Sequence, residues 1–345
     1  MRRSGTILLL LASLLASACA RTSQGAPAPT VATPAAAGPA ASAAPTARPL
    51  QRVTIGAPSP TLAFLPVQVA SRLGYFAEEG LEVEYVRAIG TTIVPSLLSG
   101  ELHFSTQLTP IGLHAAQGGD TRVVQLLATR IQHVLAARPE ITSVEQLAGK
   151  RIAVQSLNTI TAFEAQQVVD RFGLTDVALI AAGGDLERIA SIEAGAADAT
   201  VLPVPANLAA ERQGLPSLLR LSTVVAVPQA GLATSEALLR DQPDLVTRSL
   251  RAAARALPVV RDKNNGAVSR IIAEWTDQPL DDAARAYEQV ADTFSPNGMA
   301  GPTEQAAFLD LLRATAGIPA DTTPAQVFDF SVAQRVATEL GLPEQ

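Results

Sequence analysis

The sequence predicts an α/β protein built from two lobes, and three observations support this prediction. The chain has 345 residues, whereas a single hydrophobic core usually stops growing at roughly 250–300 residues. Short β-type runs alternate with helical segments of about 10–15 residues, the pattern of βαβ units around a parallel sheet. Two such series follow one another, at 51–138 and 140–222, and a mostly helical tail follows them.

Composition excludes several classes of function. The net charge is −6, from 26 Lys and Arg against 32 Asp and Glu, and no basic block is present that could bind nucleic acid. A single cysteine excludes a disulfide framework and a CxxC metal site. The three histidines, His103, His114 and His133, have no metal-ligand spacing. We therefore expect no cofactor, no metal and no nucleic-acid partner.

The first 19 residues have the pattern of a secretory signal. Two arginines precede the apolar run Ile7–Leu15, which is too short to span a bilayer. The run leads into Ala16-Ser17-Ala18-Cys19, which resembles a bacterial lipobox, although Ala16 stands where that pattern usually has Leu. The resemblance implies cleavage of residues 1–18 and lipidation of Cys19, which would anchor the protein to a membrane. An ordinary signal peptide with a chance cysteine is the alternative.

Residues 20–50 differ in composition from the rest of the chain. They contain 12 Ala and 6 Pro among 31 residues, and the spaced prolines break any helix that the alanines favour. We expect 19–50 to be a lipidated cysteine followed by a disordered tether, with a reach of at most roughly 100 Å. A low-complexity tail without function is the alternative.

The first α/β series has four expected strands and three expected helices. The strands are 52–56, 83–86, 103–106 and 123–128. The helices are 62–73, 92–98 and 110–117. Glycine follows each of these helices, and it can adopt the positive φ that ends a helix.

The second series follows Arg138-Pro139 and has the same alternation. Its expected strands are 151–154, 177–181 and 199–202, and its expected helices are 144–147, 159–172, 186–194 and 206–213. The segment 223–234 is expected to return as strands, and the chain from Glu236 onward is expected to be helical.

A family resemblance rests on five pieces of sequence in order. The first is Pro66-x-x-Val69-Ala70-x-x-x-Gly74-Tyr75-Phe76-x-x-x-Gly80-Leu81-x-Val83-Glu84. The other four are Leu97-x-Ser99-Gly100-Glu101, Ser143-Val144-x-x-Leu147-x-Gly149-Lys150-Arg151-Ile152, Ile192-x-x-Gly195-x-x-Asp198-Ala199 and Pro243-Asp244-Leu245-Val246. Residues 51–260 thereby resemble solute-binding proteins of the nitrate/sulfonate/taurine and thiamine-precursor transport family.

The resemblance implies the two-lobed periplasmic-binding-protein fold of type II, with the ligand between the lobes. Lobe 1 would comprise 51–138 with 226–345, and lobe 2 would comprise 139–225. Hinges would lie near 133–138 and 223–227, and closure would require a ligand that binds the closed form more tightly. The protein would be an extracytoplasmic, lipid-anchored monomer that captures a small polar solute, anionic or heteroaromatic, and delivers it to the permease of an ABC importer.

Candidate ligand residues follow from the rule that ligands bind beyond the carboxyl ends of the strands in an open α/β sheet. These loops are rich in hydroxyl and amide groups, which serve equally well as helix caps. The candidates are Ser59, Phe64, Thr91, Thr92, Thr106, Gln107, Arg130, Gln155, Ser156, Asn158, Thr159, Asp185 and Pro203.

Three of these candidates have explicit alternatives. Arg130 could bind a carboxylate, sulfonate or phosphonate in a bidentate manner, or lie free on the surface. Asp185 could face a cationic ligand, but it is also suited to cap the helix that begins at Leu186. Phe64 could form a wall of the cleft or pack in the core.

The sequence does not favour an enzyme. It contains no GxSxG, HExxH, P-loop or GxGxxG motif. Relatives that are pyrimidine-precursor synthases depend on a cysteine-rich segment, and Cys19 is the only cysteine of this chain. The remaining alternative is the ligand-binding subunit of another uptake or sensing system, whose partners would be separate chains.

Overall fold

The computed structural model describes residues 50–57, 61–88, 92–157 and 159–344. These residues belong to one compact unit of the chain and contain two five-stranded sheets. Cys19, the signal segment and the tether lie outside the described residues, so their predictions stay predictions.

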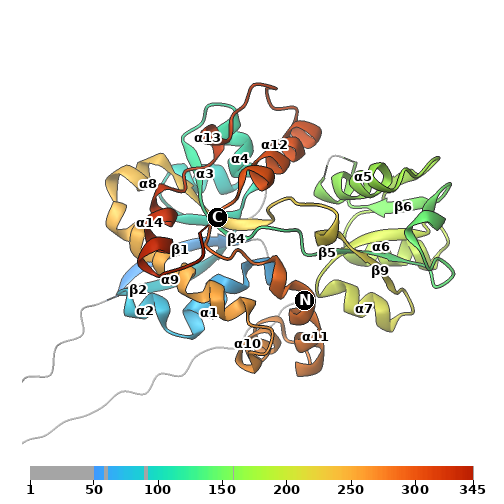
Figure 1. Cartoon of the computed structure of the whole chain (residues 1–345), viewed down its shortest axis with the longest axis horizontal. Coiled ribbons are helices and arrows are strands. Elements are labelled where there is room, and N and C mark those ends of the chain that lie inside the picture. Colours follow the sequence, from blue (N-terminus) through green and yellow to red (C-terminus); the bar gives the residue numbers. More distant parts are fainter. Residues whose placement is uncertain (1–49, 58–60, 89–91, 158, 345) are drawn as a thin grey trace, which may run out of the picture. The chain divides into compact units, whose positions relative to one another are not determined.

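The first sheet has the strand order β2-β1-β3-β10-β4. Its strands are β1 (Gln51–Ala57), β2 (Leu81–Arg87), β3 (Phe104–Gln107), β4 (Thr121–Ala128) and β10 (Ala230–Ser235). β1 is parallel to β2 and to β3, whereas β10 is antiparallel to β3 and to β4. β10, which comes from far along the chain, therefore lies inside the sheet and joins β3 to β4 (Figure 1).

Short helices connect the strands of the first sheet. They are α1 (Leu65–Arg72), α2 (Tyr75–Glu78), α3 (Ile93–Leu98) and α4 (Thr109–Ala116), and a 3₁₀ turn at Leu62–Phe64 precedes α1. Pro66 and Pro110 lie in the first turns of α1 and α4, where a missing N–H costs no helical hydrogen bond. α4 begins two residues after the end of β3, whereas α1 follows the 3₁₀ turn.

The second sheet has the order β7-β6-β8-β5-β9. Its strands are β5 (His133–Ala137), β6 (Arg151–Val154), β7 (Ala178–Ala181), β8 (Ala199–Pro203) and β9 (Ser217–Arg220). Its helices are α5 (Ile160–Phe172), α6 (Asp185–Glu193) and α7 (Ala206–Arg212), with 3₁₀ turns at Val144–Leu147 and Leu221–Thr223. β6 is parallel to β7 and β8, and β5 is antiparallel to β8.

The chain after β10 is helical. It forms α8 (Glu236–Asp241), α9 (Pro243–Arg261), α10 (Gly266–Thr276), α11 (Leu280–Val290), α12 (Pro302–Ala316), α13 (Pro324–Val327) and α14 (Ser331–Glu339), with a 3₁₀ turn at Ala291–Thr293. α9 packs on α1, α2 and α14, and both α12 and α13 contact α4. α9, α13 and α14, orange and red in Figure 1, therefore lie with elements of the first sheet, whereas α12 also contacts α5 and α11 forms an ion pair with α7 through Arg285 and Glu211.

Burial explains why these segments adopt their elements. Ile152 to Val154 in β6 and Ala199 to Leu202 in β8 are buried as continuous apolar or small runs, as expected for central strands covered on both faces. α9 instead buries one stripe, with Leu245, Val246, Leu250 and Leu257 among its buried residues at helical spacing. Central strands are thus buried along their whole length, whereas this helix is buried along one stripe.

The chain passes between the two sheets twice, and these two connecting segments, here called crossings, differ in position from the expected hinges. β5 pairs with β8 and β9 in the second sheet, although residues 133–138 were expected to end the first lobe. The first crossing is therefore 129–132, between the end of β4 and the start of β5. The second crossing is 224–229, which precedes β10 and forms no strand, because a segment between two sheets has no neighbouring strand to pair with.

Candidate functional site

A pocket of about 270 Å³ lies beside both crossings. It is lined by Thr61, Ala63, Phe64, Gln107, Leu108, Thr109, Pro110, His133, Ile160 and Gln229. These residues come from the start of the α1 region, the β3–α4 junction, the first residue of β5, the first residue of α5 and the second crossing. Both sheets therefore contribute to one pocket.

One part of the pocket wall is apolar. Phe64 is 6% exposed and Leu108 is 2% exposed, and both belong to hydrophobic clusters that continue into the core. Pro110 and Ile160 add further apolar surface to the lining. A mainly apolar wall with a few polar groups is typical of sites for small organic molecules.

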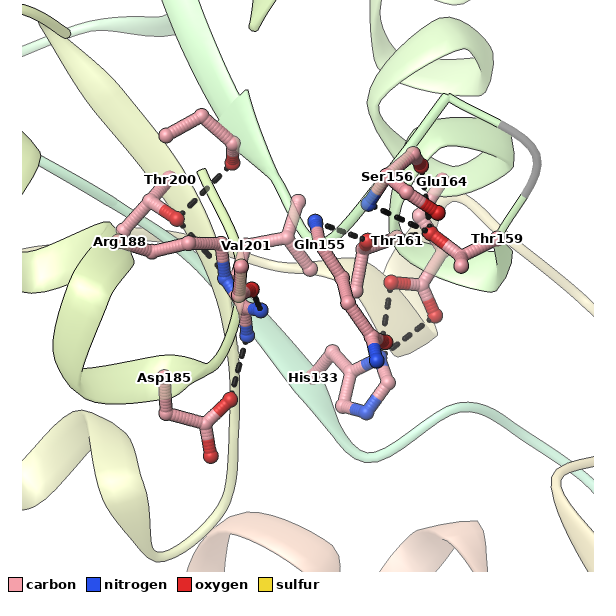
Figure 2. Close-up of polar contacts among 12 residues, drawn as sticks. His133, Gln155, Ser156, Thr159, Thr161, Glu164, Asp185, Arg188, Thr200 and Val201 are labelled. Carbon is pink, nitrogen blue, oxygen red and sulfur yellow. Dashed lines mark hydrogen bonds and ion pairs between the residues drawn. The ribbon is translucent and has the colours of Figure 1, made fainter. Parts of the chain in front are cut away.

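The polar part of the pocket centres on His133. The Nδ1 atom of His133 lies 2.7 Å and 2.8 Å from the two carboxylate oxygens of Glu164, which comes from α5 (Figure 2). The Glu164 side chain is fully buried and the His133 side chain is 10% exposed. Because a carboxylate only accepts hydrogen bonds, we assign the proton of this bond to Nδ1. The buried carboxylate thereby has a hydrogen-bond donor, as burial of a polar group requires.

Gln229 completes this arrangement from the second crossing. Its Oε1 accepts a hydrogen bond from the backbone N–H of Gln132 at 2.5 Å. Its Nε2 consequently lies toward His133, at 3.4 Å from the imidazole Nε2. A continuous chain of polar contacts therefore joins Gln132, Gln229, His133 and Glu164, and two of these residues line the pocket.

Two hydroxyl groups at the start of α5 form hydrogen bonds with backbone groups of the β6–α5 loop. The Thr159 hydroxyl donates to the Ser156 carbonyl at 2.7 Å, and the backbone N–H of Gln155 donates to the hydroxyl of Thr161 at 2.9 Å (Figure 2). Thr159 is the N-cap residue of α5 but makes no side-chain cap bond. These contacts hold the loop that precedes Ile160, and so they help to place the pocket wall.

Arg188 supports the neighbouring β7–α6 loop. Its guanidinium donates to the carbonyl of Val201 (3.2 Å) and to the Asp185 carboxylate (2.5 Å), as Figure 2 shows. It also donates to the carbonyl of Gly183 at 2.7 Å. α6 begins at Asp185 itself, with Gly184 as its N-cap, so the expected N-cap role of Asp185 is wrong. Asp185 instead pairs with a buried arginine that the sequence analysis did not single out.

The structure brings two of the sequence candidates into the pocket, Phe64 and Gln107. The Gln107 Nε2 donates to the carbonyl of Ala88 at 3.0 Å, which fixes that side chain at the end of β3. The described candidates that do not line this pocket are Thr92, Thr106, Arg130, Gln155, Ser156, Thr159, Asp185 and Pro203. The candidates Ser59, Thr91 and Asn158 lie outside the described residues.

Two of the candidates outside the pocket have clear structural contacts. Thr106 is fully buried, and its hydroxyl donates to the carbonyl of Gly56 on the adjacent strand. Arg130 lies in the first crossing and forms an ion pair with Glu304 of α12 at 3.8 Å. Both side chains therefore have partners in the protein itself.

Sequence reasoning missed His133 and Gln229 as pocket residues. Both precede or begin strands, whereas the rule that we applied selects residues after strands. β5 and β10 run antiparallel to their neighbours, so His133 pairs with Pro203 at the carboxyl end of β8, and Ala230 pairs with Gln107 at the carboxyl end of β3. The feature that could have identified both residues is their position next to a segment that connects the two sheets.

Two further findings limit the chemistry of the described segments. Within them, no group of three or more His, Cys, Asp or Glu side chains is placed to hold a metal ion. No helix in the same segments has the length and apolar character needed to cross a membrane.

The two sheets and the pocket beside their crossings define the class of protein, because they form the two-lobed α/β fold of periplasmic binding proteins. The periplasmic sulfonate-binding protein SsuA of Methylobacillus flagellatus has this fold, with a TM-score of 0.68 and 18% identity over 85% of this chain and 96% of that one. The desulfurization enzyme DSZB matches with a TM-score of 0.62 and 15% identity over 84% of this chain and 99% of that one.

The family follows from the sequence comparisons. The model of the family described as NMT1/THI5 like matches residues 61–266. The riboflavin-binding protein RibY of Chloroflexus aurantiacus is 30% identical over 272 residues, which cover 72% of this chain and 71% of that protein. The chain belongs to the NMT1/THI5-like family, as the resemblance found in the sequence implied.

Proposed function

We propose that this protein is the solute-binding component of an ABC import system and that its solute is a neutral, flavin-like heteroaromatic molecule. The observation that supports this ligand class is the pocket lining, which includes neither Lys nor Arg among the residues that the structure describes. An anion bound in a mostly apolar pocket needs a cationic or strongly donating partner. Arg130, the expected anion ligand, is paired with Glu304 instead.

The apolar wall supports the same ligand class. Phe64 offers an aromatic side chain, and Leu108 and Ile160 offer aliphatic surface, against which a flat ring system can pack. His133 and Gln229 supply polar groups that could orient such a ring. The related RibY protein carries riboflavin in its name, and riboflavin combines a flat ring system with polar ring atoms.

Capture would proceed by closure of the lobes around the solute. The crossings 129–132 and 224–229 are the two backbone connections at which the lobes could rotate. A solute that contacts both lobes favours the closed form by its differential affinity for the two forms. The closed form would then deliver the solute to a membrane permease made of separate chains.

Titration of the purified protein with riboflavin tests the ligand class. Flavin fluorescence should be quenched on binding, and saturation at a hundredfold excess over Kd should stabilise the protein by about 2.7 kcal/mol. Nitrate and an alkanesulfonate should neither stabilise the protein nor displace riboflavin. Stabilisation by either anion without any effect of riboflavin would overturn the proposed ligand class, and chemical conversion of bound riboflavin would favour an enzyme.

The membrane anchor has its own test. We propose that Cys19 is lipidated and that the Ala- and Pro-rich segment 20–50 lets the body move above the membrane. The substitution Cys19→Ser should move the protein from the membrane fraction to the soluble fraction, whereas Ser17→Ala should not. Retention of the Cys19→Ser protein in the membrane fraction would contradict lipidation.

A further inference from the structure

We infer that His133 and Gln229 together bind one edge of the solute, a ring amide or imide in which a C=O group stands beside an N–H group. This inference rests on the proposed function and names the chemical group that the pocket selects. It assigns His133 as an acceptor and Gln229 as a donor. Flavins and pyrimidinones share this ring edge, so the test below distinguishes these two sources.

Glu164 determines what His133 offers to a ligand. Both carboxylate oxygens of Glu164 lie within 2.8 Å of Nδ1, and the Glu164 side chain is fully buried. A neutral imidazole that donates from Nδ1 presents an unprotonated Nε2, which accepts a hydrogen bond. Since His133 lines the pocket, this acceptor is available to a solute N–H.

Gln132 determines what Gln229 offers. The backbone N–H of Gln132 donates to the Gln229 Oε1 at 2.5 Å, which leaves the Nε2 end of the amide beside the pocket. That NH₂ group lies 3.4 Å from the imidazole Nε2, at the long limit of a hydrogen bond. A solute that pairs with each group would therefore replace a weak contact with two stronger ones.

The two groups are complementary to a lactam edge. A donor and an acceptor that lie 3.4 Å apart on the protein match a C=O and an N–H on neighbouring ring atoms, each with its own partner. A ring in which that nitrogen is methylated keeps its shape but offers no hydrogen to His133. The Nε2 acceptor would then be buried under the ring without a partner, which is costly.

The decisive measurement compares riboflavin with N3-methylriboflavin on the wild-type protein. We expect the methylated flavin to bind at least about tenfold more weakly. Equal binding of both flavins would overturn this inference and leave the proposed function standing. Binding of neither flavin, with 1-methyluracil bound in preference to 1,3-dimethyluracil, would support the imide edge and assign it to a pyrimidine. Binding of none of these rings would overturn the proposed function and this inference with it.

Variants test whether His133 is the group responsible. His133→Phe leaves Glu164 buried without its partner, so the double variant His133→Phe/Glu164→Leu, which removes both groups, is measured beside it. In either folded variant the preference for riboflavin over N3-methylriboflavin should disappear. His103→Phe is the matched control, because His103 contacts Thr54 outside the pocket, and it should keep the preference. An unchanged preference in the double variant would overturn the assignment.

Nitrogen-15 NMR of the histidine side chains tests the underlying tautomer without any ligand. In the neutral side chain of His133 the proton should lie on Nδ1 and not on Nε2. Detection of the opposite tautomer would overturn the inference even if riboflavin binds.

Discussion

Arg188 holds the β7–α6 loop by its hydrogen bonds, and the substitution Arg188→Met tests how much they stabilise the protein. The Arg188 side chain is 3% exposed, and its guanidinium donates to the carbonyls of Gly183 and Val201 and to the carboxylate of Asp185. Methionine keeps most of the aliphatic volume of arginine but removes all of these donors. The change therefore isolates the polar contribution of the buried guanidinium.

The structure allows the size of the effect to be estimated. A hydrogen bond to a charged group contributes about 1.5–3 kcal/mol, so the two bonds to backbone carbonyls contribute about 3 kcal/mol at the lower limit. The ion pair adds less, because the Asp185 side chain is 42% exposed and exposed pairs contribute only about 0–1 kcal/mol. We expect Arg188→Met to lower the free energy of unfolding by about 3 kcal/mol, a large share of a typical 5–15 kcal/mol.

Urea denaturation followed by circular dichroism measures this loss as a shift of the midpoint at unchanged slope. Asp185→Asn is the matched control, because it changes only the exposed partner, and it should cost less than about 1 kcal/mol. A loss below about 1 kcal/mol for Arg188→Met, or equal losses for both variants, would refute the assignment of Arg188 as the support of the β7–α6 loop.

Two further predictions concern stability. Hydrogen bonds from Arg151 lower the pKa of the Asp198 carboxyl in the folded protein. The stability that this pair contributes is therefore fully present above the usual aspartate pKa of about 4. It is lost as the pH falls through the lower pKa of the folded protein. Asp198→Asn should therefore reduce the loss of urea resistance between pH 6 and about pH 3; an unchanged pH profile would contradict this. A Cβ on Gly231 would lie 2.3 Å from the Gln125 carbonyl oxygen, so Gly231→Ala should cost at least about 1–3 kcal/mol. Gly266→Ala, with no atom within 4 Å of the new Cβ, should be neutral or stabilising by up to about 1 kcal/mol in thermal unfolding.

Local patterns account for the part of the fold that the sequence predicted well. The strands 52–56, 151–154 and 199–202 were expected within one residue of β1, β6 and β8 at either end. A short run of apolar or β-branched residues between turn residues favours a strand over a helix, and this preference is local. Gly173 follows the expected helix 159–172, and it caps α5 in the left-handed conformation.

The expected strands within 223–234 were only partly correct. β10 is Ala230–Ser235, whereas 224–229 forms no strand. Apolar and β-branched residues favour an extended backbone in both parts, but a strand also needs a neighbour, and pairing partners are decided by the tertiary structure. The first crossing differs from the expected hinge for the same reason, because the pairing of β5 with β8 cannot be predicted from residues 133–137 alone.

The sequence by itself determined the α/β class and the family, and it selected Phe64 and Gln107, which line the pocket after β1 and at the end of β3. Only the tertiary structure decided that His133 and Gln229, 96 residues apart, lie 3.4 Å from one another. The physical reason is strand direction: β5 and β10 are antiparallel to their neighbours, so their first residues reach the edge where the other strands end. The direction of a strand within a sheet depends on long-range pairing, so it cannot be predicted from the local sequence.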